Sequence, residues 1–148
     1  MSHIDDVAQL IEQARQLARA YKKLTGKPLG ITGEVAEFEA ARLLGLVLAE
    51  ARAPGYDALR GAERIQIKGR VIGKDAKPGQ RVGAIKFDHP WETVMLVVLD
   101  DNFHPVEIHE MSREAAEAVL SVTNSKARKR GAMAVSTFRA NGQKVWPR

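Results

Sequence analysis

The sequence predicts an α/β fold in which a mixed β-sheet is flanked by helices. Over the first 26 residues, apolar side chains recur at helical spacing. Residues 64–71, RIQIKGRV, alternate with a period of two, as in a half-buried strand. Residues 92–100, ETVMLVVLD, form a nearly continuous apolar run rich in β-branched residues, which predicts a central strand buried on both faces. With 148 residues, the chain has the length of one domain, spanning 1–148.

The remaining elements follow from turn signals and capping residues. Ser2 is a candidate cap for the N-terminal helix, and Gly26 and Gly45 are candidate stops for the first and second helices. Three glycines and a proline predict that residues 72–83 form a loop. We divide the chain into an N-terminal helix (1–26), a core (31–122) and a C-terminal strand and tail (123–148). Within the core and tail we expect a helix from Thr32 to Gly45, strands at 55–59, 64–71, 92–100 and 105–111, a helix at 113–122 capped by Ser112, and a short strand at 132–136.

Composition excludes several classes of protein. The chain has no cysteine, which excludes disulfides, thiolate nucleophiles and cysteine zinc sites and suits a reducing cytoplasm. No apolar stretch approaches 18 residues and the N-terminus does not resemble a signal peptide, so we expect no membrane association and a cytoplasmic location. The net charge of +5 favours a polyanionic partner. The basic stretch 126–130, KARKR, fits either a solvated linker or a contact with phosphates.

One group of polar residues suggests hydrolytic chemistry. Gln66 and Lys68 are two apart in a strand, so they point to one face while Ile65 and Ile67 enter the core. A short turn at 60–63 folds the segment with Asp57 back beside that strand. The second helix then brings Glu37, or its neighbour Glu34, to the same end of the sheet. Oxygen ligands for a hard divalent cation, with a lysine near the attacking water, are what phosphodiester hydrolysis requires.

This arrangement resembles the PD-(D/E)xK nuclease superfamily, which has the restriction-endonuclease-like fold. GYDAL followed by IQIKGR is similar to the family's motif pair Asp…(Glu/Gln)-x-Lys. The resemblance covers residues 31–122 and implies that Asp57 is a metal ligand, Gln66 the second motif position and Lys68 the residue near the nucleophilic water. GEVAEFEAARLLG is similar to the family's first helix, which implies Glu37 as a further ligand and Glu34 as its competitor. Two departures are that no proline directly precedes Asp57 and that Gln66 replaces the commoner acid.

The resemblance implies a metal-dependent nuclease that hydrolyses DNA phosphodiester bonds with Mg²⁺ or Mn²⁺. We also expect a homodimer, because cutting both strands of a duplex usually requires two sites, and the long first helix is the candidate contact. The alternative is a catalytically inactive nuclease-fold protein that serves as a DNA-binding or assembly subunit. The residues also have structural interpretations: Gln66 and Lys68 fit a solvated strand face, Asp57 fits a turn, and Glu34 and Glu37 fit the acidic first turn of a helix.

Overall fold

The computed structural model describes residues 3–122 and 131–148 and confirms the α/β class. Its main sheet has six strands in the order β1-β2-β3-β5-β6-β8, and β4 pairs with β7 in a small second sheet. The strands are β1 (Val47–Leu48), β2 (Ala58–Arg60), β3 (Glu63–Val71), β4 (Arg81–Val82), β5 (Thr93–Leu99), β6 (Pro105–Ser112), β7 (Met133–Ala134) and β8 (Gln143–Trp146). The described helices are α1 (His3–Thr25), α2 (Thr32–Leu44), α3 (Arg113–Ser121) and α5 (Val135–Asn141).

The centre of the sheet agrees with the expectations from periodicity. All seven residues of β5 are buried, as the apolar run predicted. β5 runs parallel to β3 and antiparallel to β6, so the sheet is mixed. β2 and β3 form an antiparallel hairpin in which Ala58 is opposite Ile65. The predicted hairpin is therefore confirmed with different bounds: its first strand is 58–60 and not 55–59, and the turn is shorter than 60–63 because Arg60 pairs with Glu63.

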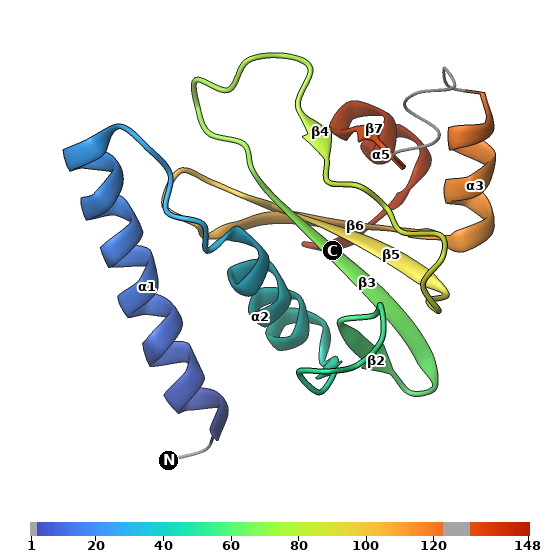
Figure 1. Cartoon of the computed structure of the whole chain (residues 1–148), viewed down its shortest axis with the longest axis horizontal. Helices are drawn as coiled ribbons and strands as arrows, with labels where there is room; N and C mark the ends of the chain where they lie inside the picture. Colours follow the sequence, from blue (N-terminus) through green and yellow to red (C-terminus); the bar gives the residue numbers. More distant parts are fainter. Residues whose placement is uncertain (1–2, 123–130) are drawn as a thin grey trace.

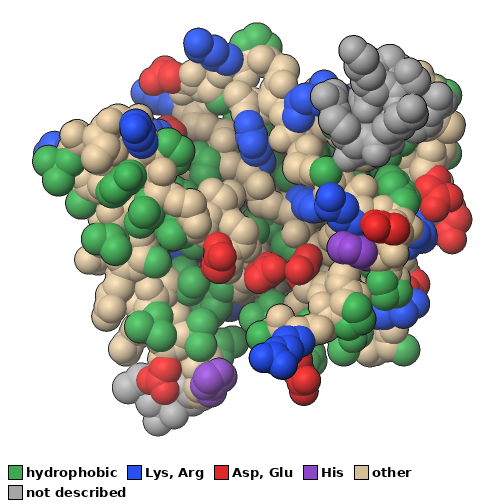
Figure 2. Space-filling model, in the orientation of Figure 1, with side chains coloured by type: hydrophobic (Ala, Val, Ile, Leu, Met, Phe, Trp, Pro, Cys, Tyr) green, Lys and Arg blue, Asp and Glu red, His purple; other side chains and the backbone are tan. Residues whose placement is uncertain are grey.

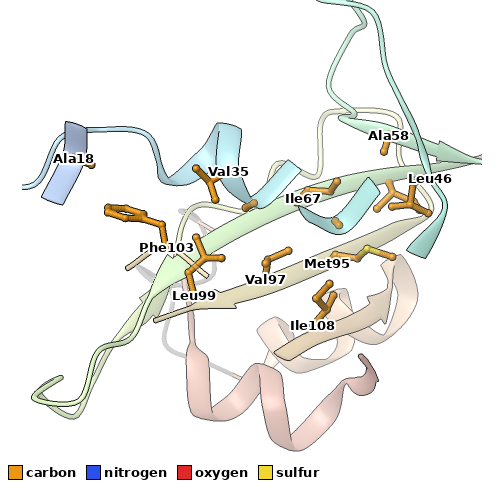
Figure 3. Close-up of a cluster of buried hydrophobic side chains, with 13 residues drawn as sticks. Ala18, Val35, Leu46, Ala58, Ile67, Met95, Val97, Leu99, Phe103 and Ile108 are labelled. Carbon is orange, nitrogen blue, oxygen red and sulfur yellow. The ribbon is translucent and has the colours of Figure 1, made fainter. Parts of the chain in front are cut away.

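Helices cover both faces of the sheet (Figure 1). Alternate side chains of β5 point to opposite faces, because the side-chain period of a strand is two. Met95, Val97 and Leu99 pack in the cluster beneath α2, which Figure 3 shows in close-up. The other alternating set packs in a second cluster with α3 and α5. The site described below lies where β3 meets both of these layers.

The N-terminal helix is attached to the core by a buried ion pair. Arg15 of α1 donates from Nη2 to Glu39 Oε1 of α2 at 2.8 Å, and from Nε to the carbonyl oxygen of Phe103 at 2.9 Å. Both charged side chains are almost fully buried. Glu39 also accepts from Arg42 Nη2 at 2.5 Å, so its buried charge is paired with two arginines. The bonds from Arg15 fix the position of α1 beside α2.

The C-terminal region contains more regular structure than the sequence indicated. Residues 123–148 were expected to form a strand and a tail, but α5 and β8 both lie there. The expected strand at 132–136 is reduced to Met133–Ala134, because Val135 already begins α5. Phe138 of α5 is fully buried, and β8 pairs with β6, so tertiary contacts stabilise both elements. The basic stretch 126–130 lies outside the described residues. Across the part of the chain that the structure describes, no helix has the length and apolar character needed to cross a bilayer.

Candidate functional site

Asp57 lies one residue before β2 and is bonded to β3 through both its main chain and its side chain. Its N–H donates to the carbonyl oxygen of Ile65 at 2.8 Å. Its carboxylate Oδ2 accepts the N–H of Ile67 at 2.7 Å. The Asp57 carboxylate thus accepts the N–H of Ile67, which lies just beyond the last β3 residue that pairs with β2. A backbone carbonyl would otherwise have to accept this N–H. This bond fixes the carboxylate at the edge of β3, between Gln66 and Lys68.

Two glycines allow the neighbouring segments to approach this point. A Cβ at Gly69 would lie 2.6 Å from Ala36 Cβ, so only glycine lets α2 pack this closely on β3. Gly55 has φ of 76°, and a Cβ there would lie 2.3 Å from His89 Cβ. The absence of these two side chains brings α2 and the segment around His89 close to Asp57 from different sides.

Glu37 on α2 is half-buried and reaches Asp57. Burial raises the pKa of Glu37 from 4.5 to about 7, and the adjacent Asp57 adds to the rise through charge repulsion and a hydrogen bond between the two carboxyl groups. Glu34, one turn earlier and exposed, adds a smaller repulsion to the same pKa. Two carboxyl groups therefore lie close together, and with a pKa of about 7 Glu37 is about half protonated at pH 7.

Gln66 is buried, with 4% of its surface exposed. Its side chain points away from the α2 face, because its neighbours Ile65 and Ile67 belong to the core beneath α2. Gln66 Oε1 accepts the main-chain N–H of Lys86 at 3.3 Å. An amide oxygen has two lone pairs, so this bond leaves one available for a further donor or a cation. The structure therefore gives Gln66 one definite partner, Lys86, which the sequence did not suggest.

Lys68 is half-buried beside Asp57. Burial lowers the pKa of Lys68, repulsion from Lys86 lowers it further, and the Asp57 carboxylate opposes both effects. Lys68 and Lys86 are therefore near enough to repel each other, on the side of Asp57 away from α2. The structure thus brings together Glu37, Asp57 and Lys68, with Gln66 and Lys86 beside them.

Lys86 was missed because it lies in an irregular segment between β4 and β5. Arg113, the first residue of α3, fixes this segment by donating to the carbonyl oxygens of His89 (2.7 Å), Trp91 (3.1 Å) and Phe87. Its guanidinium also lies 4.8 Å from the centre of the Trp91 ring. Trp91 Nε1 in turn donates to the carbonyl oxygen of Lys86 at 2.6 Å. No local sequence motif indicates such a long-range anchor.

The oxygen donors fit a hard divalent cation. Figure 2 shows acidic side chains gathered between α2 and β3, with basic side chains and a histidine next to them. Two carboxylates and an amide oxygen, with water completing the shell, are ligands that Mg²⁺ and Mn²⁺ accept. In residues 3–122 and 131–148, no three histidine or acidic side chains form a metal-binding group. Gln66 points to the opposite face of β3 from α2, and the partner that the structure gives its amide oxygen is the Lys86 N–H.

Comparison with known proteins does not identify a family. No family model matches the chain, and no curated protein is significantly similar to it. We therefore infer the function from the geometry and electrostatics of the site.

Proposed function

We propose that the protein is a metal-dependent nuclease that hydrolyses DNA phosphodiester bonds. The observation that carries the proposal is the meeting of the Glu37 and Asp57 carboxyl groups beside Lys68 at the edge of β3. Two acids that repel each other in a half-buried position are stabilised by a cation between them, and the lysine supplies positive charge next to the place where a phosphate would bind.

In this proposal, Asp57 and Glu37 hold the cation, Gln66 contributes its amide oxygen, and Glu34 is the alternate carboxylate. Bound Mg²⁺ or Mn²⁺ supplies Lewis-acid polarisation of the phosphate and a more acidic bound water. Lys68 orients the attacking water and offsets the negative charge that develops in the transition state. The bond from Ile67 N–H keeps the Asp57 carboxylate oriented throughout.

Basic side chains along β3 and the segments after it suit a DNA backbone. Beyond Lys68, β3 continues to the exposed Arg70, and exposed lysines lie at positions 74, 77 and 86. Each contact between such a side chain and a phosphate releases counterions, so binding is expected to weaken with salt. Since duplex cleavage requires a cut in each strand, a homodimer is part of the proposal. A cytoplasmic location is also proposed, in keeping with the absence of cysteine.

The test is a metal titration with plasmid, single-stranded and branched DNA, each with Mg²⁺, with Mn²⁺ and with EDTA. We expect cleavage that requires the metal and is lost in Asp57→Asn. Lys68→Met should retain metal affinity yet lose cleavage, because its charge acts on the water and the phosphate. The exposed Asp75→Asn is the matched control and should cleave as the unaltered protein does. Inactivity of the unaltered protein on every DNA form with both metals contradicts the proposal.

A second function is favoured by the neutral Gln66. Because this residue supplies no charge and already accepts the Lys86 N–H, the site holds a cation less tightly than one with a third acid. The alternative is therefore a catalytically inactive nuclease-fold protein that binds DNA or serves in an assembly. Salt-sensitive DNA binding without cleavage would support this alternative, and the absence of both binding and cleavage would contradict both functions.

A further inference from the structure

Helix α1 has an apolar face that the rest of the described chain leaves exposed. Its inner face packs on the core through Ile11 and Ala18 and is anchored by Arg15. A second set of large apolar side chains on α1 remains in solvent, and Figure 2 shows hydrophobic side chains gathered over this helix. The exposed members of this set are Leu10 (63%), Leu17 (64%), Tyr21 (39%) and Leu24 (86%), and Ile4 (50%) is exposed on α1 outside it.

The exposed residues follow coiled-coil spacing. Alternating steps of three and four residues lead from Val7 through Ala14 to Leu24. Side chains at this spacing form one narrow seam along a helix and repeat every seven residues. At 100° per residue, the seam lies roughly a quarter-turn around the helix from the buried face. The complete seam is Val7, Leu10, Ala14, Leu17, Tyr21 and Leu24.

The helix is held firmly enough to present this seam. The buried bonds from Arg15 to Glu39 and to the carbonyl oxygen of Phe103 attach the middle of α1 to two separate segments of the core. Figure 1 shows α1 at one side of the molecule, next to α2 and away from α3 and α5. A second helix can therefore approach the seam without displacing the contacts that hold α1.

We propose that the seam binds α1 of a second copy of this chain in antiparallel orientation. In this arrangement Leu24 packs against the partner's Val7, Tyr21 against the partner's Leu10, and Leu17 against the partner's Ala14, so large residues meet smaller ones near the two-fold axis. The same residues contribute from both copies, as a two-fold interface requires. This interface specifies the homodimer that is part of the proposed function, and it can be tested without DNA or nuclease activity.

Charge selects the antiparallel orientation. The first turn of α1 carries Asp5 and Asp6, and its last turn carries Lys22 and Lys23. Antiparallel pairing brings the acidic end of each helix to the basic end of its partner and opposes the two helix dipoles. Parallel pairing would instead place four aspartates together at one end and four lysines at the other. The pattern of charges therefore favours the two-fold antiparallel pair.

The first experiment measures mass by light scattering over a range of protein concentrations. We expect a particle of about twice the chain mass of 16.3 kDa. Leu17→Glu introduces two charges into the centre of the seam, so the dissociation constant of the dimer should rise at least about 100-fold. Gln16→Glu adds the same charge at an exposed position outside the seam and should leave the dimer intact. Leu17 is mostly exposed in the single chain, and circular dichroism checks that both variants fold.

The second experiment determines orientation by disulfide formation, which is straightforward because the natural chain has no cysteine. In a mixture of Val7→Cys and Leu24→Cys proteins, antiparallel pairing predicts the mixed disulfide. A Leu24→Cys protein that readily links to itself would indicate parallel pairing and would overturn the inference. A monomer at all concentrations, or a dimer indifferent to Leu17→Glu, would overturn it as well.

Discussion

Replacing Glu37 by glutamine should stabilise the metal-free protein while removing its response to metal. In the native structure this carboxyl group is half-buried against Asp57, and its pKa is raised from 4.5 to about 7. A glutamine of similar shape keeps the packing of α2 and removes the charge that the site tolerates poorly. The same charge is what the proposed cation requires.

The direction and size of the effect follow from proton linkage. Between pH 4.5 and about 7 the folded state keeps a proton on Glu37 that the unfolded state loses, so the stability of the native protein falls as pH rises through this window. A shift of this size corresponds to roughly 3 kcal/mol at full burial, at 1.36 kcal/mol per pKa unit. Because Glu37 is only half-buried, solvent screening reduces the expected penalty to about 1–2 kcal/mol.

The assay is urea unfolding of both proteins in EDTA at pH 5 and pH 8, repeated at pH 8 with Mn²⁺. Glu37→Gln should be more stable than the native protein by about 1–2 kcal/mol at pH 8, with a smaller difference at pH 5. Mn²⁺ should stabilise the native protein and have much less effect on the variant. Glu34→Gln on the exposed turn of α2 is the matched control, with a small gain at most. Equal stabilities of native and Glu37→Gln proteins at pH 8 would show that the Glu37 charge does not destabilise the folded protein.

Three further changes test the support of the site. Gly69→Ala should destabilise the protein by about 1–3 kcal/mol in urea unfolding, because the added Cβ meets Ala36 of α2. The control Gly33→Ala has open space around it and should be neutral or stabilising. Equal effects of the two substitutions would contradict the close packing of α2 on β3. Gln66→Glu should bind Mn²⁺ more tightly in calorimetric titration and be less stable in EDTA, since it adds a carboxylate beside the proposed cation. An unchanged affinity for Mn²⁺ would show that residue 66 is not a ligand. Arg113→Lys should lower the free energy of unfolding by about 2 kcal/mol and change the fluorescence of Trp91, because an ammonium group cannot replace the guanidinium at three carbonyl oxygens. A fluorescence spectrum identical to that of the native protein would contradict the anchoring role of Arg113.

The sequence was most informative where periodicity is local and strong. The apolar run of β5 predicted its burial because all seven of its residues are buried. The alternation in β3 predicted a strand but not the burial of Gln66, which lies between the buried Ile65 and Ile67. The resemblance favoured Glu37 over Glu34, but the spacing of the residues alone left both open, since both fit the first turns of α2. The structure distinguishes them through the approach of α2 at Gly69, which brings Glu37 to Asp57 and leaves Glu34 exposed.

Features that depend on distant contacts were not predictable. The four-residue strand β8 is too short for a clear period and forms through its pairing with β6. Lys86 lies in a segment without regular structure, and its position depends on Arg113, 27 residues later in the chain. The burial of Gln66 likewise depends on that segment covering β3. Sequence patterns therefore predicted the strands that carry the site but not the loop that completes it.

The most direct test of the central claim is calorimetric titration of the dialysed protein with Mn²⁺ at pH 7 in two buffers of different ionisation enthalpy. A cation bound by Glu37 and Asp57 displaces the proton from Glu37, which is about half protonated at pH 7, so we expect one site per chain and release of about half a proton. Asp57→Asn should abolish this site. Absence of saturable binding, or binding that is unchanged in Asp57→Asn, would contradict the assignment of a metal centre to this edge of the sheet.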